Sequence, residues 1–239
     1  RDHQLAHPVH KRADGSVESQ QALVACTAIS RPGHRGPLGM LNLITMDLSQ
    51  GVTPTDSDAV LASGSTVMAS PSRIYVALGH GSVARDRYVE ATDVHVFDTS
   101  SPNRTDYRAS GSVEGSLLNQ FSMSEHDDRL RIATTLSSFA VSPLPAEDAV
   151  ANSTSIAPPA QASESAVTVL EQRGDRLSQV GPMTGLGKGE RIYAVRFLGD
   201  RGYVVTFRQT DPLYTVDLSD PTAPLVTGSI VISRGVEYR

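Results

Sequence analysis

The sequence predicts an all-β protein, a β-propeller of four-stranded antiparallel blades that is incomplete, with about three blades and part of another. Short runs rich in β-branched and aromatic residues alternate with Gly, Pro, Asp and Ser turns. Almost no segment has the period of an amphipathic helix. Four of the strand-like runs end in an acidic residue, and a run containing glycine follows each of them. A repeat of this kind, with a period of ~40–50 residues, is typical of propeller blades.

The N-terminal region precedes the first strands. Residues 1–20 are polar and aperiodic, which predicts a disordered arm before a propeller domain at 21–239. Cys26, the sole cysteine, lies in the apolar run "ALVACTAI" and is expected to be a small buried side chain. A single cysteine excludes an internal disulfide and a cysteine-based zinc site. A partial blade is predicted at 22–64, with the strand "MLNLITMDL" at 40–48.

Three fuller copies follow, at about 66–113, 120–180 and 191–232. The last is the clearest, with strands "RIYAVRF", "RGYVVTF", "LYTVD" and "PLVTGSIVI", which we denote a, b, c and d. The third copy contains a Ser, Ala and Pro segment at 137–164 that cannot bury enough apolar surface to order itself. We therefore predict a loop insertion between its strands b and c.

Each copy has an acidic residue and a glycine at corresponding positions. The acids that end the c strands are Asp47, Asp98, Glu171 and Asp217, and the glycines assigned to the d strands are Gly64, Gly111, Gly181 and Gly228. Three of the b strands begin at arginines, namely Arg73, Arg129 and Arg201. The acids are predicted to accept hydrogen bonds from backbone N–H groups of the following turn, as in Asx-turns.

The composition excludes some partners. The chain has 239 residues, a net charge of −5 and only two lysines, Lys11 and Lys188. A nucleic-acid partner is excluded because binding to phosphates needs clustered basic residues. No apolar run approaches the length of a transmembrane helix.

Two long strings carry a family resemblance. The strings "GSVEGSLLNQFSMSEHDDRLRIATT" (111–135) and "ERIYAVRFLGDRGYVVTFRQTDPLYTVDLSDPTAP" (190–224) resemble secreted bacterial and archaeal proteins whose C-terminal β-propeller is distantly related to WD repeats. The match is looser over 22–113. The resemblance implies a secreted or cell-surface location and a propeller that continues beyond this chain, which looks like a truncated portion. It implies no activity, cofactor or catalytic residue.

Candidate ligand-binding residues follow from blade geometry. In a propeller the d–a and b–c loops share one face, where ligands usually bind by analogy with the fold. These loops contribute the candidate ligand-binding residues Asn119, Gln120, Arg208, Gln209 and Asp211. Arg208 and Asp211 either orient a polar ligand or pair with each other, and we favour the pairing.

Other motifs are given structural interpretations. The acidic turn at 125–128 lacks the spaced oxygen ligands and the glycine of a calcium loop, so a hairpin turn is favoured. The segment "GPMTGLGKGE" (181–190) lacks the residue order of a phosphate loop and is interpreted as a connection between blades. His3, His7 and His10 lie in the predicted arm, where nothing fixes a metal geometry. The sequence therefore predicts no catalytic residues, metal site or cofactor.

Three hypotheses of function remain. The leading hypothesis is a non-enzymatic, extracytoplasmic binding or scaffold module for a protein or a cell-envelope component. The alternatives are a hydrolase or other enzyme with a site at the channel mouth, and a metal- or sugar-binding propeller. Because the loop face carries mostly Ser, Gly, Pro and amide residues, binding is favoured over catalysis. An open arc of blades is also expected to self-associate through its apolar ends.

Overall fold

The computed structural model describes residues 9–11, 14–15, 17–20, 24–32, 39–51, 54–84, 87–140, 162–207 and 211–232. Within these ranges the chain forms β-strands and two short 3₁₀ turns, without an α-helix. The prediction of an all-β chain is confirmed.

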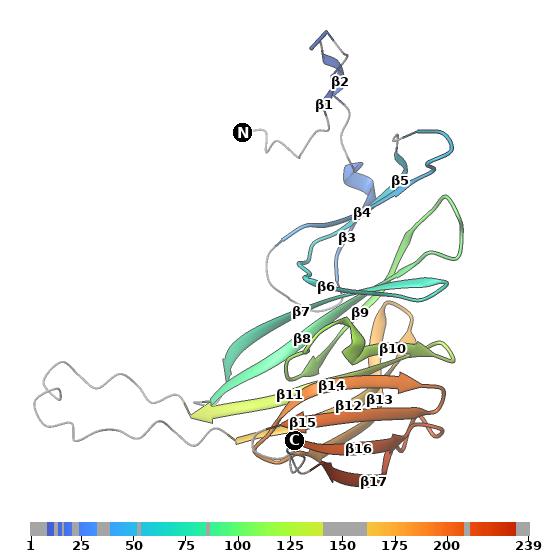
Figure 1. The fold of residues 1–239 in the computed structure, drawn as a ribbon. Coiled ribbons are helices and arrows are strands. Elements are labelled where there is room, and N and C mark those ends of the chain that lie inside the picture. The colour runs from blue at the N-terminus through green and yellow to red at the C-terminus, as the bar shows by residue number, and fades with distance from the viewer. Residues whose placement is uncertain are drawn as a thin grey trace, which may run out of the picture.

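Three four-stranded antiparallel meanders follow one another along the chain (Figure 1). Blade 2 comprises β6 (Thr66–Ala69), β7 (Arg73–Ala84), β8 (Arg87–Asp98) and β9 (Asp106–Glu114). Blade 3 comprises β10 (Met123–His126), β11 (Arg129–Ala140), β12 (Ala162–Arg173) and β13 (Arg176–Leu186). Blade 4 comprises β14 (Arg191–Leu198), β15 (Arg201–Phe207), β16 (Asp211–Asp217) and β17 (Leu225–Ile232). The strands occur in the order a, b, c, d that the repeat predicts.

A smaller sheet, blade 1, precedes them. It contains β3 (Ile29–Ser30), β4 (Leu41–Met46) and β5 (Pro54–Val60) in the order β3-β5-β4. This is the partial copy predicted at 22–64. Gly64 lies after the end of β5 and not within strand d.

The N-terminal region differs from the expectation in two places. Within the predicted disordered arm, β1 (Val9–Lys11) pairs with β2 (Val17–Gln20) in a separate hairpin. Its connection contains Asp14-Gly15, a dipeptide that favours tight turns, with Gly15 at a φ of 82°. Cys26 is exposed and not buried, because the 3₁₀ turn η1 (Cys26–Ala28) interrupts the apolar run before β3 begins.

Successive sheets are held together by three apolar cores. Val60, Val76 and Phe97 pack between blades 1 and 2, and Val94, Met123 and Ile132 pack between blades 2 and 3. Val169, Val195 and Phe197 pack between blades 3 and 4. Strand β8 buries both faces, since Val94 and Val96 contact one core while Phe97 contacts the other. Residues 92–97 of this strand are accordingly all buried, whereas in a half-exposed strand burial would alternate.

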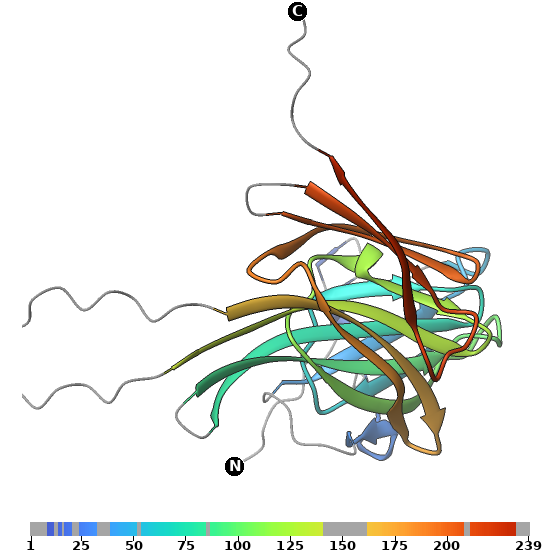
Figure 2. The ribbon, with the colours of Figure 1, turned by 90° about the horizontal axis from the view of Figure 1, so that it is seen from below.

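Blades 2 and 3 are joined by strand pairing as well as by their core (Figure 2). Arg176 of β13 pairs with Ser110 of β9, and residues 138–140 of β11 pair with residues 87–89 of β8. The ends of the predicted insertion are therefore strand: Ser137 pairs with Ser163, and only 141–161 lies outside the described residues. The loop prediction from composition was wrong at both ends of the segment, because strand pairing supplies backbone hydrogen bonds to any residue except proline.

The repeated glycines mark places where blades approach closely. A methyl group at Gly111 of β9 would lie 2.5 Å from the carbonyl oxygen of Leu177, which belongs to blade 3. One at Gly181 of β13 would overlap the carbonyl oxygen of Pro221 in blade 4. At Gly228 of β17 nothing lies within 4 Å. The glycine is thus required where a following sheet is present.

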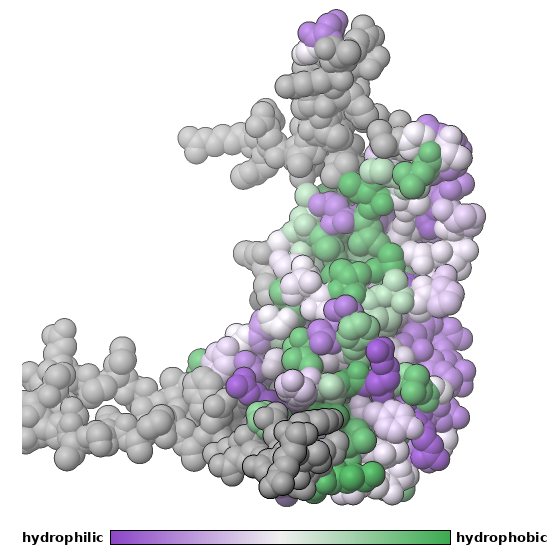
Figure 3. Space-filling view, viewed as in Figure 1, coloured by the Kyte–Doolittle hydropathy of each residue, from purple (hydrophilic) through white to green (hydrophobic). Residues whose placement is uncertain are grey.

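An apolar surface lies on β17. Leu225, Ile230 and Val231 are 63%, 65% and 60% exposed. In Figure 3 hydrophobic residues gather at the lower end of the molecule, where Figure 1 shows β16 and β17.

Candidate functional site

The repeated acids hold the turns that follow their strands. Asp47, Asp98 and Asp217 each accept the backbone N–H of a serine two residues later, at 2.9, 2.9 and 3.0 Å. Hydrogen bonds from these serines lower the pKa of all three carboxyls. The predicted Asx-turn chemistry is confirmed for these aspartates, which leaves them a structural role.

Glu171 differs from the three aspartates, because among the described residues its carboxylate accepts hydrogen bonds from arginine side chains alone. It lies 3.4 Å from the guanidinium of Arg129 and 3.1 Å from that of Arg173. Arg129 is its cross-strand partner, and Arg73 and Arg201 stand opposite Asp98 and Asp217 in the same way. The arginine that begins strand b and the acid that ends strand c are therefore directly paired positions in all three blades.

The acidic turn at 125–128 is a two-residue hairpin turn, as predicted. Asp127 and Asp128 have φ of 48° and 59°, the left-handed values that a type I′ turn needs at both positions. On this side of the molecule, His126 Nε2 lies 3.1 Å from Asp200 Oδ1. The neighbouring Arg131 is buried and lies over the ring of Phe197, 5.2 Å from its centroid. Burial lowers the pKa of Arg131.

The structure places the five predicted ligand-binding residues in different settings. The Asn119 side chain accepts the backbone N–H of Phe121 at 2.9 Å and so caps the 3₁₀ turn η2 (Gln120–Ser122), in which Gln120 is exposed. Asp211 begins β16 and pairs with Ile232. Arg208 and Gln209 lie outside the described residues. Asn119 therefore has a structural role, and ligand binding by the set of five residues stays a prediction.

Two depressions instead lie at the ends of the b and d strands. The first, of about 430 Å³, lies between blades 2 and 3, and its charged lining residues are Glu90, Glu114, Glu164 and Lys188. The second, of about 380 Å³, lies between blades 3 and 4 and is lined by Leu118, Arg191, Tyr193 and Phe207 among others. They adjoin, because Gly115 lines the first and Ser116 the second. Both volumes fall at the small end of the range for ligand sites.

A β-bulge shapes the second depression. Ile192 pairs with Thr206 and Ala194 with Val205, which leaves Tyr193 as the extra residue. Before the bulge Ile192 is buried, and after it Val195 and Phe197 are buried. Tyr193 is turned outward, 69% exposed, with its ring centroid 6.1 Å from that of Phe207. Bulges commonly redirect a side chain beside a functional site.

The other wall is an interruption in the first strand of blade 3. Ser116 forms an isolated bridge with Thr135, after which the chain leaves the sheet through η2 and returns as β10. Leu118 and Phe121, on this excursion, are exposed. The Thr135 side chain accepts the backbone N–H of Ile192 at 3.1 Å, which fixes blade 4 against the interruption.

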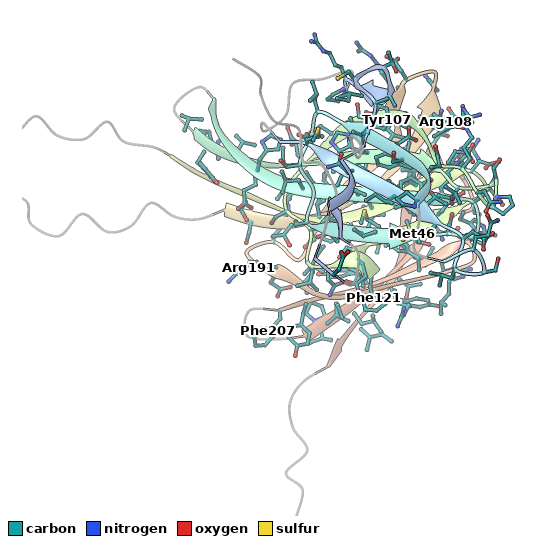
Figure 4. All side chains as sticks on the ribbon, turned by 90° about the horizontal axis from the view of Figure 1, so that it is seen from above. Met46, Tyr107, Arg108, Phe121, Arg191 and Phe207 are labelled. Carbon is teal, nitrogen blue, oxygen red and sulfur yellow. The ribbon has the colours of Figure 1, made fainter. Side chains whose placement is uncertain are left out.

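Two arginines flank the exposed rings. Arg191 lines the depression, and the guanidinium of Arg196 lies 4.8 Å from the centroid of the Phe121 ring. In Figure 4, Arg191, Phe121 and Phe207 lie on one side of the molecule, away from Tyr107 and Arg108. Among the described residues neither Arg191 nor Arg196 forms an ion pair, whereas Arg108 lies 3.1 Å from Asp98. The site thus presents cations and aromatic rings.

Sequence reasoning missed Tyr193, Phe207 and both arginines because it searched loops, and these residues lie on strands. A signal was present: in "RIYAVRF" the apolar residues at 192, 195 and 197 change parity, which indicates a bulge near Tyr193. In the parts of the chain that the structure describes, no three His, Cys, Asp or Glu side chains are placed to hold a metal ion. None of the described helices has the length and apolarity to cross a membrane.

Comparison with known proteins places the chain among propeller domains. A family model described as "Beta propeller domain" matches residues 3–234. An uncharacterised protein of the archaeon Methanocaldococcus jannaschii is 41% identical over 123 residues, which are 52% of this chain and 16% of that protein. An uncharacterised protein of Archaeoglobus fulgidus is 36% identical over 152 residues, 64% of this chain and 20% of that protein. The chain thus spans a fifth or less of the length of these curated relatives.

Proposed function

Because the chain belongs to the beta propeller domain family, we propose that it is a non-enzymatic binding module whose binding face contains the two adjoining depressions. The observation that carries this proposal is the second depression, where exposed aromatic rings lie beside an arginine with no ion pair among the described residues. Exposed aromatic and arginine side chains are the residues that contribute most to binding at protein interfaces.

The partner proposed is a protein or a cell-envelope component outside the cytoplasm. The location is supported by the resemblance of 111–135 and 190–224 to secreted propeller proteins. Binding is supported over hydrolysis by the chemistry of the second depression. Ser116, Thr135 and Tyr193 supply hydroxyls there, and its described lining residues include neither a histidine nor a carboxylate to activate them.

Site-specific photo-crosslinking tests the proposal in the full-length protein in its own host. A photoreactive residue in place of Tyr193 is expected to form a crosslink to a partner in the extracytoplasmic fraction. The matched control replaces Thr222, which is exposed in the c–d turn of blade 4. Crosslinks from position 222 alone, or a purely cytoplasmic location, would contradict the proposal. So would steady hydrolysis of ester or peptide substrates by the purified protein that Tyr193→Ala abolishes.

A further inference from the structure

The exposed side chains around β14 form a continuous surface, which we call the β14 strip. It consists of Arg191, Tyr193 and Arg196 on β14, Phe207 on β15, and Leu118 and Phe121 before β10. Contacts connect its members: Tyr193 contacts Phe207, Arg196 contacts Phe121, and Leu118 lines the same depression as Arg191. The strip is therefore aromatic in the middle and cationic at both ends.

The bulge sets the spacing of the two cations. Arg191 pairs with Phe207 and Arg196 with Tyr203, and these partners are four residues apart on the unbulged strand β15. Four residues of strand span ~13 Å. Because side chains an even number of ladder positions apart lie on the same side of a sheet, both guanidinium groups project from one side of β14. Without the extra residue at Tyr193 they would project from opposite sides.

The strip carries two positive charges, although the chain as a whole is acidic. The net charge is −5, yet among the described residues the strip's arginines have no carboxylate partner. Arg196 contacts the face of the Phe121 ring, and this contact occupies none of its N–H donors. A guanidinium binds a carboxylate through two parallel N–H donors. Two arginines whose backbone positions are ~13 Å apart along the sheet match carboxylate residues at positions i and i+4 of an extended peptide, with residue i+2 facing the rings between them.

We propose that the β14 strip binds an extended acidic peptide segment whose carboxylates are four residues apart and whose central residue is aromatic or large and apolar. This assignment rests on the proposed binding function and names the ligand class of the same face. A small monocarboxylate filling the 380 Å³ depression would contact Arg191 but would not span the distance to Arg196.

Fluorescence anisotropy with a labelled pentapeptide, Asp-Ala-Phe-Ala-Asp, tests this with the 239-residue chain. Arg191→Gln and Arg196→Gln are each expected to weaken binding about tenfold, as loss of one charge-assisted hydrogen-bonded pair does. Tyr193→Ala is expected to weaken it as well, and raising the salt concentration should do the same. Arg201→Gln is the matched control, because Arg201 is exposed in the same sheet but stands opposite Asp217 at the other end of β15.

Three results would overturn the assignment. The first is equal binding of Asn-Ala-Phe-Ala-Asn, since charge would then play no part. The second is competition by 3-phenylpropionate as strong as that by the peptide, with Arg196→Gln unaffected, which indicates a small-acid pocket. The third is no binding of the acidic peptide at millimolar concentration. In that case a crosslink from position 193 in cells would still support the binding function, so the two proposals fail separately.

Discussion

Asp47, Asp98 and Asp217 show how one repeated residue acts. Each is half-buried, and each uses a carboxylate oxygen to accept the N–H of a serine in the turn between strands c and d. Because these hydrogen bonds favour the ionised form, they lower the folded-state pKa. A local rule about turn residues was enough to predict this interaction, since its partner lies two residues away in the chain.

The lowered pKa values predict an acid-dependent loss of stability. A carboxyl with a lower pKa in the folded state stabilises the fold above its unfolded pKa of ~3.9, and this contribution disappears as the pH falls through the folded value. The free energy of unfolding should therefore decrease when the pH is lowered below about 4. In the triple variant Asp47→Asn, Asp98→Asn and Asp217→Asn, an amide oxygen still accepts the serine N–H but does not titrate. Urea unfolding between pH 2 and 6 should give a shallower acid dependence for this variant, and an unchanged slope would show that other groups cause it.

Strands and sheets follow the sequence closely where their signals are local. The four strands of blade 4 and their order match the pattern of 191–232 because each strand is bounded by its own turn residues. Features that depend on contacts with a neighbouring sheet were not predicted from the sequence. Three features depend on residues that are far away in the chain. They are the pairing of 138–140 with 87–89, the outward orientation of Tyr193, and the need for glycine where two blades approach closely. Loop position alone likewise did not reveal that Asn119 caps η2.

The two glycines of neighbouring d strands are expected to respond in opposite directions to the same substitution. Gly181→Ala forces a methyl group onto the carbonyl oxygen of Pro221 and should destabilise the fold by about 2 kcal/mol, as overpacking does. Gly228→Ala meets no atom within 4 Å and should be neutral or stabilising by about 0.5 kcal/mol, because alanine loses less backbone entropy in a strand. Urea denaturation of both variants measures this, and equal costs would show that the glycines serve the strands and not the contact between blades.

At the scale of the whole molecule, the sheets form a series in which each core is shared by two neighbours. An interior blade such as blade 3 buries both of its faces, while the last strand of the series keeps apolar side chains at the surface. Exposed apolar surface of this kind favours association.

The 239-residue chain is therefore expected to self-associate through β17. Sedimentation velocity should show dimers or larger species whose proportion rises with protein concentration. Replacing Ile230 by Lys should shift the distribution toward monomer, since it places a charge in the middle of the apolar surface. Val83, 63% exposed near the end of β7, supplies the control Val83→Lys. A monomer at all concentrations, or an equal effect of both variants, would count against β17 as the contact.

Gly228 also makes β17 a sensor for its surroundings. In blades 2 and 3 a missing methyl group leaves room for a neighbour, whereas at 228 that room is empty. The loss of stability caused by Gly228→Ala therefore reports whether another chain segment packs against β17 at this position. If Gly228→Ala is silent in the isolated chain but harmful in a longer polypeptide or an assembly, the difference between the two unfolding free energies measures the occupancy of that place without any structure of the larger particle.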